Sequence, residues 1–375
     1  RGGWRVSLYE KAKVLEEAGA GVQLSPNASA ILRRLGVIER LISFALRPNA
    51  IRIRRARDGA TLALMPLDEV ERRWGAPYLV VHRADLQRTL LEAIAREPRI
   101  RLQTGAAVAG FASGKDSVAI AIEQGAVRLK AAADCLIGAD GVRSFVRLRL
   151  GADSARFSGQ TAWRATVDAA RAPPAMRREE TTLWLGRKAH LVHYPLRGGA
   201  VINVVAIVDE DFRPGEADLW SSPGSPEFLK ARFSSWNATA RELLRAAPDW
   251  RKWPVFDCQP IANWTAGRVA LVGDAAHPML PFLAQGAAQA IEDADVLGKF
   301  LTCGQDIETS LRAYQAARCH RAARVQRESR GQAKIYHFAG PAALLRDLAL
   351  RALGPQKMLA RYDWLYDAHD ANGHK

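Results

Sequence analysis

The run of residues 267–297, GRVALVGDAAHPMLPFLAQGAAQAIEDADVL, contains the strongest signs of chemistry in the sequence. A short apolar strand at 269–272 leads through a glycine to Asp274, which predicts a carboxylate at the carboxyl end of a sheet, where open α/β sheets bind ligands. A helix of small residues begins near Gly286 and Ala287, and the first N–H groups of a helix are free and lie at positive potential. These features suit a flat cofactor ring that becomes anionic on reduction. A tightly packed helix without a ligand is the alternative interpretation.

Two further carboxylates follow predicted strands. Asp140 lies in the run GADGVRS at 138–144, directly after an apolar strand that ends at Ile137. This position suits cofactor binding at a sheet edge, although an aspartate that caps the next helix gives the same pattern. Glu10 closes a strand predicted at residues 5–9, and an acidic residue there binds the adenosine ribose in dinucleotide folds. A solvated glutamate is the alternative.

A different pattern marks a candidate substrate pocket. His190 and Tyr194 are four residues apart in a predicted strand, so alternation places them on one face of a sheet. A histidine has an unperturbed pKa of about 6.5 and therefore suits the role of general base near neutral pH. The alternatives are a histidine on an exposed strand and a tyrosine of the core.

The elements that must hold these residues indicate an α/β protein interrupted by a β-sheet. Residues 158–207 show the alternation typical of an antiparallel sheet, with a hairpin turn at 197–199, and an α/β pattern both precedes and follows them. After Gly286 the pattern is helical almost to the end, with a break at Gly340. Such a layout is typical of interleaved two-domain enzymes, whose sites form where the domains meet.

The composition narrows the classes of function. The sequence has 375 residues, with 54 Lys and Arg against 39 Asp and Glu and a net charge of +15. Its length suggests two or three domains, or one large α/β domain with an insertion. The basic residues form no run of five or more, so we expect a solvated surface that attracts anionic cofactors and substrates. Only the charge suggests the alternative of a nucleic-acid binder.

Neither a metal site nor membrane insertion is expected. The four cysteines are widely spaced and form no CxxC pair, which favours reduced thiols in the cytoplasm over zinc. No stretch of about 18 uncharged apolar residues and no signal peptide is visible. The sequence begins at Arg1 rather than at a methionine.

The motifs together resemble the class A flavoprotein monooxygenases, especially the salicylate hydroxylase and 3-hydroxybenzoate 6-hydroxylase branch. Gly138–Ser144 is similar to the DG motif of that family, and Gly273–Pro278 is similar to its GD motif. The likeness also covers an early loop at 19–28, an arginine-bearing element at 82–86 and the ending at 361–366.

The resemblance implies the 4-hydroxybenzoate hydroxylase type of α/β fold. In that fold a Rossmann-like FAD-binding domain contains an inserted antiparallel β-sheet domain for the substrate, and helices follow at the C-terminus. We assign residues 1–48, 76–157 and 254–320 to the FAD-binding domain, residues 49–75 and 158–253 to the substrate domain, and residues 321–375 to the C-terminal helical segment.

The resemblance also implies FAD as cofactor and NADH or NADPH as reductant. Glu10 is expected at the ribose, Val108 beside the adenine and Arg143 in contact with NAD(P)H. The residues assigned to cofactor binding are Glu10, Lys11, Gln23, Arg83, Val108, Asp140, Arg143, Asp274, Gly286 and Ala287. The GxGxxG loop of the family would lie before Arg1, so we interpret the chain as N-terminally truncated. A flavin-binding remnant without hydroxylase activity is therefore an alternative function.

For the substrate site, the resemblance implies that His190 removes the proton of a phenol and that Tyr194 holds the substrate oxygen. Leu280, Pro281 and Phe282 are expected to line an apolar pocket. The implied reaction is the hydroxylation of a phenolic or hydroxybenzoate-type ring with O₂, through a C4a-hydroperoxyflavin.

The expected partners are O₂ and a small aromatic substrate, without nucleic acid or stable membrane insertion, and the protein is expected to be a monomer or homodimer. Gln23 stands where related 6-hydroxynicotinate enzymes have a functional histidine, which favours a benzenoid ring over a pyridine. A related flavin monooxygenase that acts on a non-aromatic substrate is the remaining alternative.

Overall fold

The computed structural model describes residues 2–15, 21–211 and 222–367. The early loop that carries part of the family likeness includes Gly19 and Ala20, and both lie outside the described residues.

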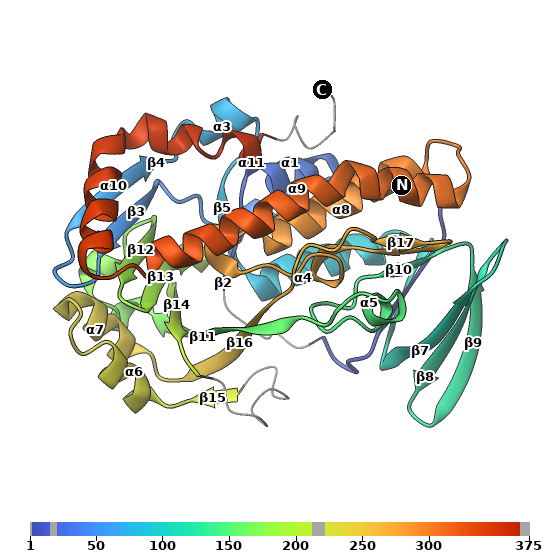
Figure 1. Cartoon of the computed structure of the whole chain (residues 1–375), viewed down its shortest axis with the longest axis horizontal. Coiled ribbons are helices and arrows are strands. Elements are labelled where there is room, and N and C mark those ends of the chain that lie inside the picture. The colour runs from blue at the N-terminus through green and yellow to red at the C-terminus, as the bar shows by residue number, and fades with distance from the viewer. Residues whose placement is uncertain (1, 16–20, 212–221, 368–375) are drawn as a thin grey trace.

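A mixed sheet of eight strands dominates one side of the molecule (Figure 1). Its order is β15 (Ser222–Gly224), β16 (Trp250–Asp257), β11 (Arg156–Asp168), β14 (Val201–Asp209), β13 (Ala189–Leu196), β12 (Glu180–Gly186), β3 (Ala50–Arg55) and β4 (Thr61–Pro66). All neighbouring strands are antiparallel except β12 and β3, which are parallel because β3 comes from a separate, earlier segment. The expected inserted sheet is therefore antiparallel apart from one pair.

The two faces of this sheet have different neighbours because side chains alternate along each strand. Trp163 and Trp184 lie in the hydrophobic core that the sheet forms with α6 (Pro226–Arg232) and α7 (Ala238–Ala246). On the opposite face, Ala162 and Ile207 pack in a cluster with Phe282. The second face thus contacts the loop that follows the GD motif.

The remaining strands form four smaller sheets in the described part of the chain. β1 (Val6–Glu10) pairs in parallel with β6 (Ile100–Thr104), and β10 (Leu136–Gly138) pairs in parallel with β18 (Val269–Leu271), which β17 (Thr265–Ala266) extends. β2 (Gly21–Leu24) pairs with β5 (Leu79–His82). A meander of β7 (Ala106–Ser113), β8 (Val118–Gln124) and β9 (Val127–Ala133) lies at the end of the molecule opposite α10 (Figure 1).

Two long helices connect these parts. α8 (Gly286–Leu301) packs against α9 (Ile307–Tyr336), which runs from the β10–β17 region to the eight-stranded sheet (Figure 1). α10 (Gly340–Ala360) then covers β4, and α11 (Asp363–Tyr366) follows it. The shorter helices are α1 (Pro26–Arg34), α2 (Ile38–Ile42), α3 (Val70–Trp74), α4 (Arg83–Ala95) and α5 (Phe145–Arg149).

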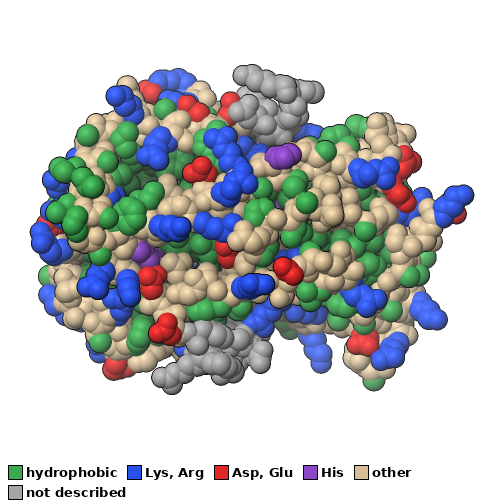
Figure 2. Space-filling view, viewed as in Figure 1, with side chains coloured by type: hydrophobic (Ala, Val, Ile, Leu, Met, Phe, Trp, Pro, Cys, Tyr) green, Lys and Arg blue, Asp and Glu red, His purple; other side chains and the backbone are tan. Residues whose placement is uncertain are grey.

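The basic side chains are scattered over the surface, as the sequence predicts. Figure 2 shows Lys and Arg side chains distributed over one face among apolar and acidic ones, without a single basic stripe. Within the described ranges, none of the helices combines the length and apolar composition that a bilayer span requires.

Candidate active site

The two carboxylate-bearing motifs lie side by side at one end of a parallel pair of strands. Gly138 of β10 is opposite Leu271 of β18, and the Val272 N–H donates to the Gly138 carbonyl at 3.0 Å. Because the strands are parallel, the loops that leave them emerge at the same edge, where open α/β sheets bind ligands. Asp140 and Asp274 are therefore carried to a common edge, as the sequence predicts.

A buried arginine ties these loops together. The Arg147 guanidinium donates to the carbonyls of Asp274 and Ala275, each at 3.1 Å, and also to the carbonyl of Val142. Arg147 is 1% exposed, so these carbonyls replace water as the hydrogen-bond acceptors of its guanidinium. The contact holds the DG and GD motifs in a fixed relation.

Asp140 itself is engaged at the start of α5. Its carboxylate accepts from the Ser144 hydroxyl and from the Val146 N–H at 3.1 Å. The local geometry therefore includes the helix-capping role that the sequence left open. Arg143 is exposed on the same loop, with its guanidinium 5.5 Å from the centre of the Phe256 ring.

Asp274 lies close to the N-terminus of α8. Its side chain is exposed to solvent, yet the protein that surrounds it raises the pKa of the carboxyl by desolvation, against the charges of His277, Arg83 and Arg147. Protein atoms therefore surround this carboxylate closely although solvent still reaches it. A Cβ atom at Gly286 would lie 4.0 Å from Asp274 Oδ1, so the start of α8 lies beside this carboxylate.

The backbone before α8 is strained in the way that functional loops often are. Ala284 has φ 52° and ψ 35°, in the left-handed region that a residue with a Cβ seldom adopts. This conformation turns the chain from the 281–283 turn into α8 and leaves Gly286 and Ala287 partly exposed.

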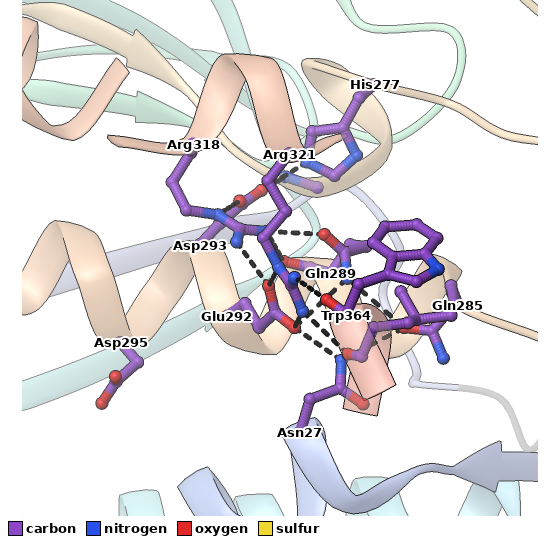
Figure 3. Close-up of polar contacts among 12 residues, drawn as sticks. Asn27, His277, Gln285, Gln289, Glu292, Asp293, Asp295, Arg318, Arg321 and Trp364 are labelled. Carbon is purple, nitrogen blue, oxygen red and sulfur yellow. Dashed lines mark hydrogen bonds and ion pairs between the residues drawn. The ribbon is translucent and has the colours of Figure 1, made fainter. Parts of the chain in front are cut away.

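A buried ionic network beneath α8 supports the GD loop (Figure 3). Asp293 accepts from the Gly273 N–H at 2.8 Å, lies 2.5 Å from His277 Nε2 and accepts from Arg318 Nε at 2.7 Å. Burial opposes ionisation of Asp293, but His277 and Arg318 hold the pKa of this carboxyl below its ordinary value. The neighbouring Glu292 pairs with Arg318 as well.

The network continues to the beginning of the chain and to its last helices. Arg321 binds Glu292 at 2.7 Å and the carbonyl of Trp364 at 2.7 Å, while the Asn27 side chain donates to Glu292 at 2.5 Å and to Gln285 at 3.1 Å. Figure 3 shows these groups converging between α1, α8 and α9. The N-terminus of α8 is therefore fixed from below by residues far apart in the sequence.

The expected ribose end of the cofactor site lies along β1. Glu10 accepts from the Ala12 N–H at 2.7 Å, Lys11 is exposed, and Val108 lies on the adjoining β7. An open pocket here is lined by Glu10, Ala12, Lys13, Val14, Leu15 and Gln87.

A second cationic group lies where the cofactor side meets the sheet. Arg83 begins α4, and its charge acts on the Asp274 carboxyl, on the Tyr194 hydroxyl and on Arg164 of β11. Burial, together with the charge of Arg83, lowers the pKa of Arg164 to about 10. Arg164 Nε is buried without a hydrogen-bond partner in the described part of the chain, and the guanidinium lies 5.2 Å from the Trp253 ring.

Tyr194 packs against β2. Its hydroxyl lies so close to Gly21 that a Cβ there would be only 2.6 Å away, so this position requires glycine. Gln23 hydrogen-bonds to Tyr194 and accepts from the Tyr78 hydroxyl at 2.6 Å. Desolvation raises the pKa of Tyr194, which therefore keeps its proton at neutral pH. In this structure the Gln23 side chain is thus a hydrogen-bond partner of the Tyr194 hydroxyl.

His190 is on the same face as Tyr194, because β13 pairs His190 with Ile207 and Tyr194 with Asn203 of β14. The ring of Phe282 lies 5.0 Å from that of His190. Desolvation lowers the pKa of His190 well below its ordinary value, so the ring is neutral at pH 7. The structure thus brings the candidate base together with the predicted apolar loop.

α9 holds that loop against the sheet. The Leu280 carbonyl accepts from the Ser329 hydroxyl at 2.6 Å, and the Pro278 carbonyl accepts from Gln326 at 2.8 Å. Leu280 and Phe282 are buried, and Pro281 is partly exposed.

The arrangement fits FAD. The Asp274 carboxylate is solvent-accessible and lies beside the partly exposed first residues of α8, and an acidic residue with a pocket lies along β1. Across the described ranges, no cluster of three or more metal-ligating side chains occurs.

Several residues of this site were not identified from the sequence. They are Arg147, Arg164, Asp293 and Arg318, together with His337 and Asp209, because His337 Nε2 lies 2.9 Å from His190 Nδ1 and His337 Nδ1 lies 2.8 Å from Asp209 Oδ1. The sequence pattern could have identified Arg318, because this residue lies on the same helical stripe of α9 as the buried Leu311, Tyr314, Ala322 and Val325. A charged residue on an apolar stripe requires a buried partner.

Comparison with known proteins identifies the family that the sequence motifs resemble. Residues 1–329 match the family described as FAD binding domain. The chain is 38% identical to 3-amino-4-hydroxybenzoate 2-monooxygenase from Streptomyces platensis, over 98% of this chain and 90% of that protein. It is 35% identical to 3-hydroxybenzoate 6-hydroxylase from Polaromonas naphthalenivorans, with the same coverage.

Solved structures confirm the expected fold. A salicylate hydroxylase substrate complex superposes with a TM-score of 0.81 at 25% identity, covering 98% of both chains. Klebsiella pneumoniae HpxO, complexed with FAD and uric acid, gives 0.83 at 25% identity, covering 97% of this chain and 90% of that one. The chain therefore belongs to the class A FAD-dependent aromatic-ring monooxygenases, which use NAD(P)H and O₂.

Proposed function

We propose that this enzyme hydroxylates a hydroxybenzoate-type ring that lies on the second face of the eight-stranded sheet, with its hydroxyl group at His190 and its carboxylate toward Tyr194 and Arg164. The proposal rests on the placement of two residues on one apolar face: a neutral histidine, and a cationic arginine whose Nε has no hydrogen-bond partner within the described part of the chain. The names of the relatives, which act on 3-hydroxybenzoate and 3-amino-4-hydroxybenzoate, support the same class of substrate.

Arg164 supplies the recognition of the anionic group. A buried guanidinium without an acidic partner is costly, and an incoming carboxylate would offset that cost through charge-assisted hydrogen bonds. In the sheet Arg164 is opposite Val205, which is opposite Val192 between His190 and Tyr194. The strand register therefore leaves an apolar floor between the proposed hydroxyl and carboxylate ends.

His190 accepts the proton of the substrate hydroxyl. Its low pKa keeps the ring unprotonated, which a base requires, and loss of the proton makes the aromatic ring electron-rich. Tyr194, which remains protonated, donates a hydrogen bond to a substrate oxygen. Gln23 orients that hydroxyl.

The residues proposed to hold FAD are those at the common edge and along β1. Glu10 would bind the ribose, Arg83 and Asp274 the middle of the cofactor, and the N–H groups of Gly286 and Ala287 the flavin ring. When bound, the reduced flavin activates O₂ for transfer of one oxygen atom to the substrate ring. Lys11, Val108, Asp140 and Arg143 complete the proposed cofactor contacts.

The loop 280–282 excludes water from the reacting ring. Leu280 and Phe282 are buried between the sheet and α9, so the surroundings of the proposed substrate site are apolar. Exclusion of water limits the loss of activated oxygen as peroxide.

The test is NAD(P)H oxidation by the FAD-loaded protein with 3-hydroxybenzoate, salicylate, 4-hydroxybenzoate and 3-methylphenol, with analysis of the products. We expect at least one hydroxybenzoate to stimulate oxidation and to yield a dihydroxylated ring in an amount that matches the NAD(P)H consumed. Stimulation without any hydroxylated product from this panel would refute the substrate class.

A variant tests the base. His190→Asn is expected to lower kcat by about 10²-fold at neutral pH, the lower end of what general-base catalysis contributes. His320→Asn, on the exposed side of α9, is the control and should leave kcat unchanged. An unchanged kcat in both variants would remove His190 from the mechanism.

We also propose that the enzyme works in the cytoplasm as a monomer or homodimer, without nucleic acid. The four cysteines form no disulfide, which agrees with a reducing compartment. Size-exclusion chromatography with light scattering tests the assembly state.

A further inference from the structure

We propose that His190, His337 and Asp209 form a proton relay that carries the proton of the bound phenol from the buried pocket to the protein surface. The inference rests on the proposed role of His190 and goes beyond it, because it assigns the route by which that proton leaves.

The three side chains are in line. His190 Nδ1 lies 2.9 Å from His337 Nε2, and His337 Nδ1 lies 2.8 Å from Asp209 Oδ1. His190 is 2% exposed, whereas the side chains of His337 and Asp209 are 7% and 34% exposed. The chain of contacts thus runs from the core to solvent.

Three separate elements supply these residues. His190 is in β13, Asp209 is the last residue of β14, and His337 is the residue that ends α9. His337 caps the helix through its backbone, so its ring is not needed for that capping. The ring instead bridges the other two residues.

The acceptor at the end of the chain fixes the tautomers. An ionised carboxylate only accepts hydrogen bonds, so His337 Nδ1 carries the proton and His337 Nε2 must accept. His190 Nδ1 therefore donates, and His190 Nε2 remains as the proton acceptor. This is the arrangement that a general base needs toward the substrate.

Each proton that enters the relay at His190 is matched by one that leaves it at Asp209, and the same holds for the reverse transfer. The substrate O–H bond breaks and an N–H bond forms at His190 Nε2, while the Nδ1 proton passes to His337 Nε2 and the His337 Nδ1 proton passes to Asp209 or to water. The reverse transfer, when the product oxygen is protonated before release, restores the first set of tautomers. No co-reactant other than water is required.

The surrounding groups keep the relay from trapping the proton. Burial opposes charge at Asp209, but hydrogen bonds from His337 and Gln160 and the charge of Arg232 hold the pKa of Asp209 below its ordinary value. A carboxyl with a low pKa returns the proton to solvent. Burial and the neighbouring His337 lower the pKa of His190, so it too releases the proton readily.

The other groups beside the relay are neutral or peripheral. Tyr336 of α9 and Phe282 pack against His190, with ring centres 5.4 and 5.0 Å away, and desolvation keeps Tyr336 protonated. The Lys188 N–H contacts the His337 carbonyl at 3.5 Å. Asp209 is therefore the charged end of the chain.

The experiment is stopped-flow mixing of the FAD-loaded enzyme with 3-hydroxybenzoate in weak buffer with phenol red, which records proton release on binding, together with the pH profile of kcat. His337→Asn retains hydrogen bonding but cannot relay a proton. We expect proton release to slow by about tenfold or more. We also expect kcat to recover as the pH rises toward the ordinary pKa of a phenol, about 10.

Two further variants keep the result interpretable. His320→Asn makes the same change on an exposed part of α9 and should match the wild type in both readouts. Asp209→Asn retains an acceptor oxygen for His337, and it should slow proton release even if His337→Asn fails to fold.

The possible outcomes separate the two proposals. Proton release and a pH profile that are unchanged in both His337→Asn and Asp209→Asn, while His190→Asn is impaired, would overturn the relay and leave the base in place. An unimpaired His190→Asn would overturn the base itself.

Discussion

Arg147 and Asp274 are joined by a hydrogen bond from the buried guanidinium to the backbone carbonyl, at 3.1 Å, and this contact links the two loops that bear Asp140 and Asp274, the carboxylates proposed to bind the cofactor. The same guanidinium binds the carbonyls of Ala275 and Val142. One side chain of α5 therefore connects the DG and GD motifs, in addition to the pairing of β10 with β18.

Replacing this side chain should loosen both loops. Arg147→Gln leaves buried carbonyls without donors, so we expect a loss of about 2–4 kcal/mol in the free energy of unfolding and at least a tenfold weaker FAD affinity. Urea denaturation and quenching of FAD fluorescence measure the two effects. Arg149→Gln, an exposed position on the same helix, should change unfolding by less than about 0.5 kcal/mol. Equal effects of the two substitutions would contradict the clamp.

Asp274 should show a conflict between stability and binding. The pKa of Asp274 is raised in the folded protein, so ionisation of its carboxyl lowers the free energy of unfolding. This loss of stability grows as the pH rises from the ordinary pKa of an aspartate through the raised pKa of Asp274. Asp274→Asn should therefore raise the Tm of the FAD-free protein at pH 7 but leave it unchanged below about pH 4. Its FAD affinity should fall about tenfold through loss of a charge-assisted hydrogen bond. A lower Tm at pH 7 would show that the carboxylate stabilises the fold.

The ionic network beneath α8 should contribute strongly to stability. Arg318→Met leaves Glu292 and Asp293 buried with too few partners, and we expect a loss of about 3–5 kcal/mol. Arg312→Met, at an exposed ion pair of the same helix, should cost less than about 1 kcal/mol. Chemical denaturation of both variants provides the comparison. Similar denaturation midpoints would be inconsistent with a buried network that stabilises α8.

Arg164 should determine preference for carboxylated rings. Arg164→Gln is expected to raise the KM for 3-hydroxybenzoate by about 10- to 100-fold, which corresponds to the loss of a charged hydrogen bond, with little change for 3-methylphenol. Arg156→Gln, an exposed residue of the same strand, is the matched substitution and should alter neither KM. If KM rises equally for both substrates in Arg164→Gln, the arginine shapes the pocket and does not recognise the carboxylate.

The motifs could be identified without coordinates because each is local. The turn after β18 that carries Asp274, the strand end at Glu10 and the four-residue spacing of His190 and Tyr194 depend on neighbours in the chain, and local periodicity and turn chemistry determine such features. The same local reasoning predicted the hairpin of β13 and β14, which the strand register confirms.

The partners of these motifs could not be identified in that way. His337 is 147 positions from His190, and Arg147 is 127 positions from Asp274, so no spacing within one element relates them. The parallel pairing of β3 with β12 likewise joins segments separated by more than a hundred residues.

The sequence by itself therefore determined the family, the cofactor and the residues that end its strands with carboxylates. Only the tertiary structure decided that Gln23 contacts Tyr194, that Arg164 Nε is buried without a hydrogen-bond partner among the described residues, and that His190 is connected to the surface. The physical reason is that burial and charge pairing depend on which distant elements pack together, whereas a strand, a turn and the first turn of a helix depend on the residues beside them.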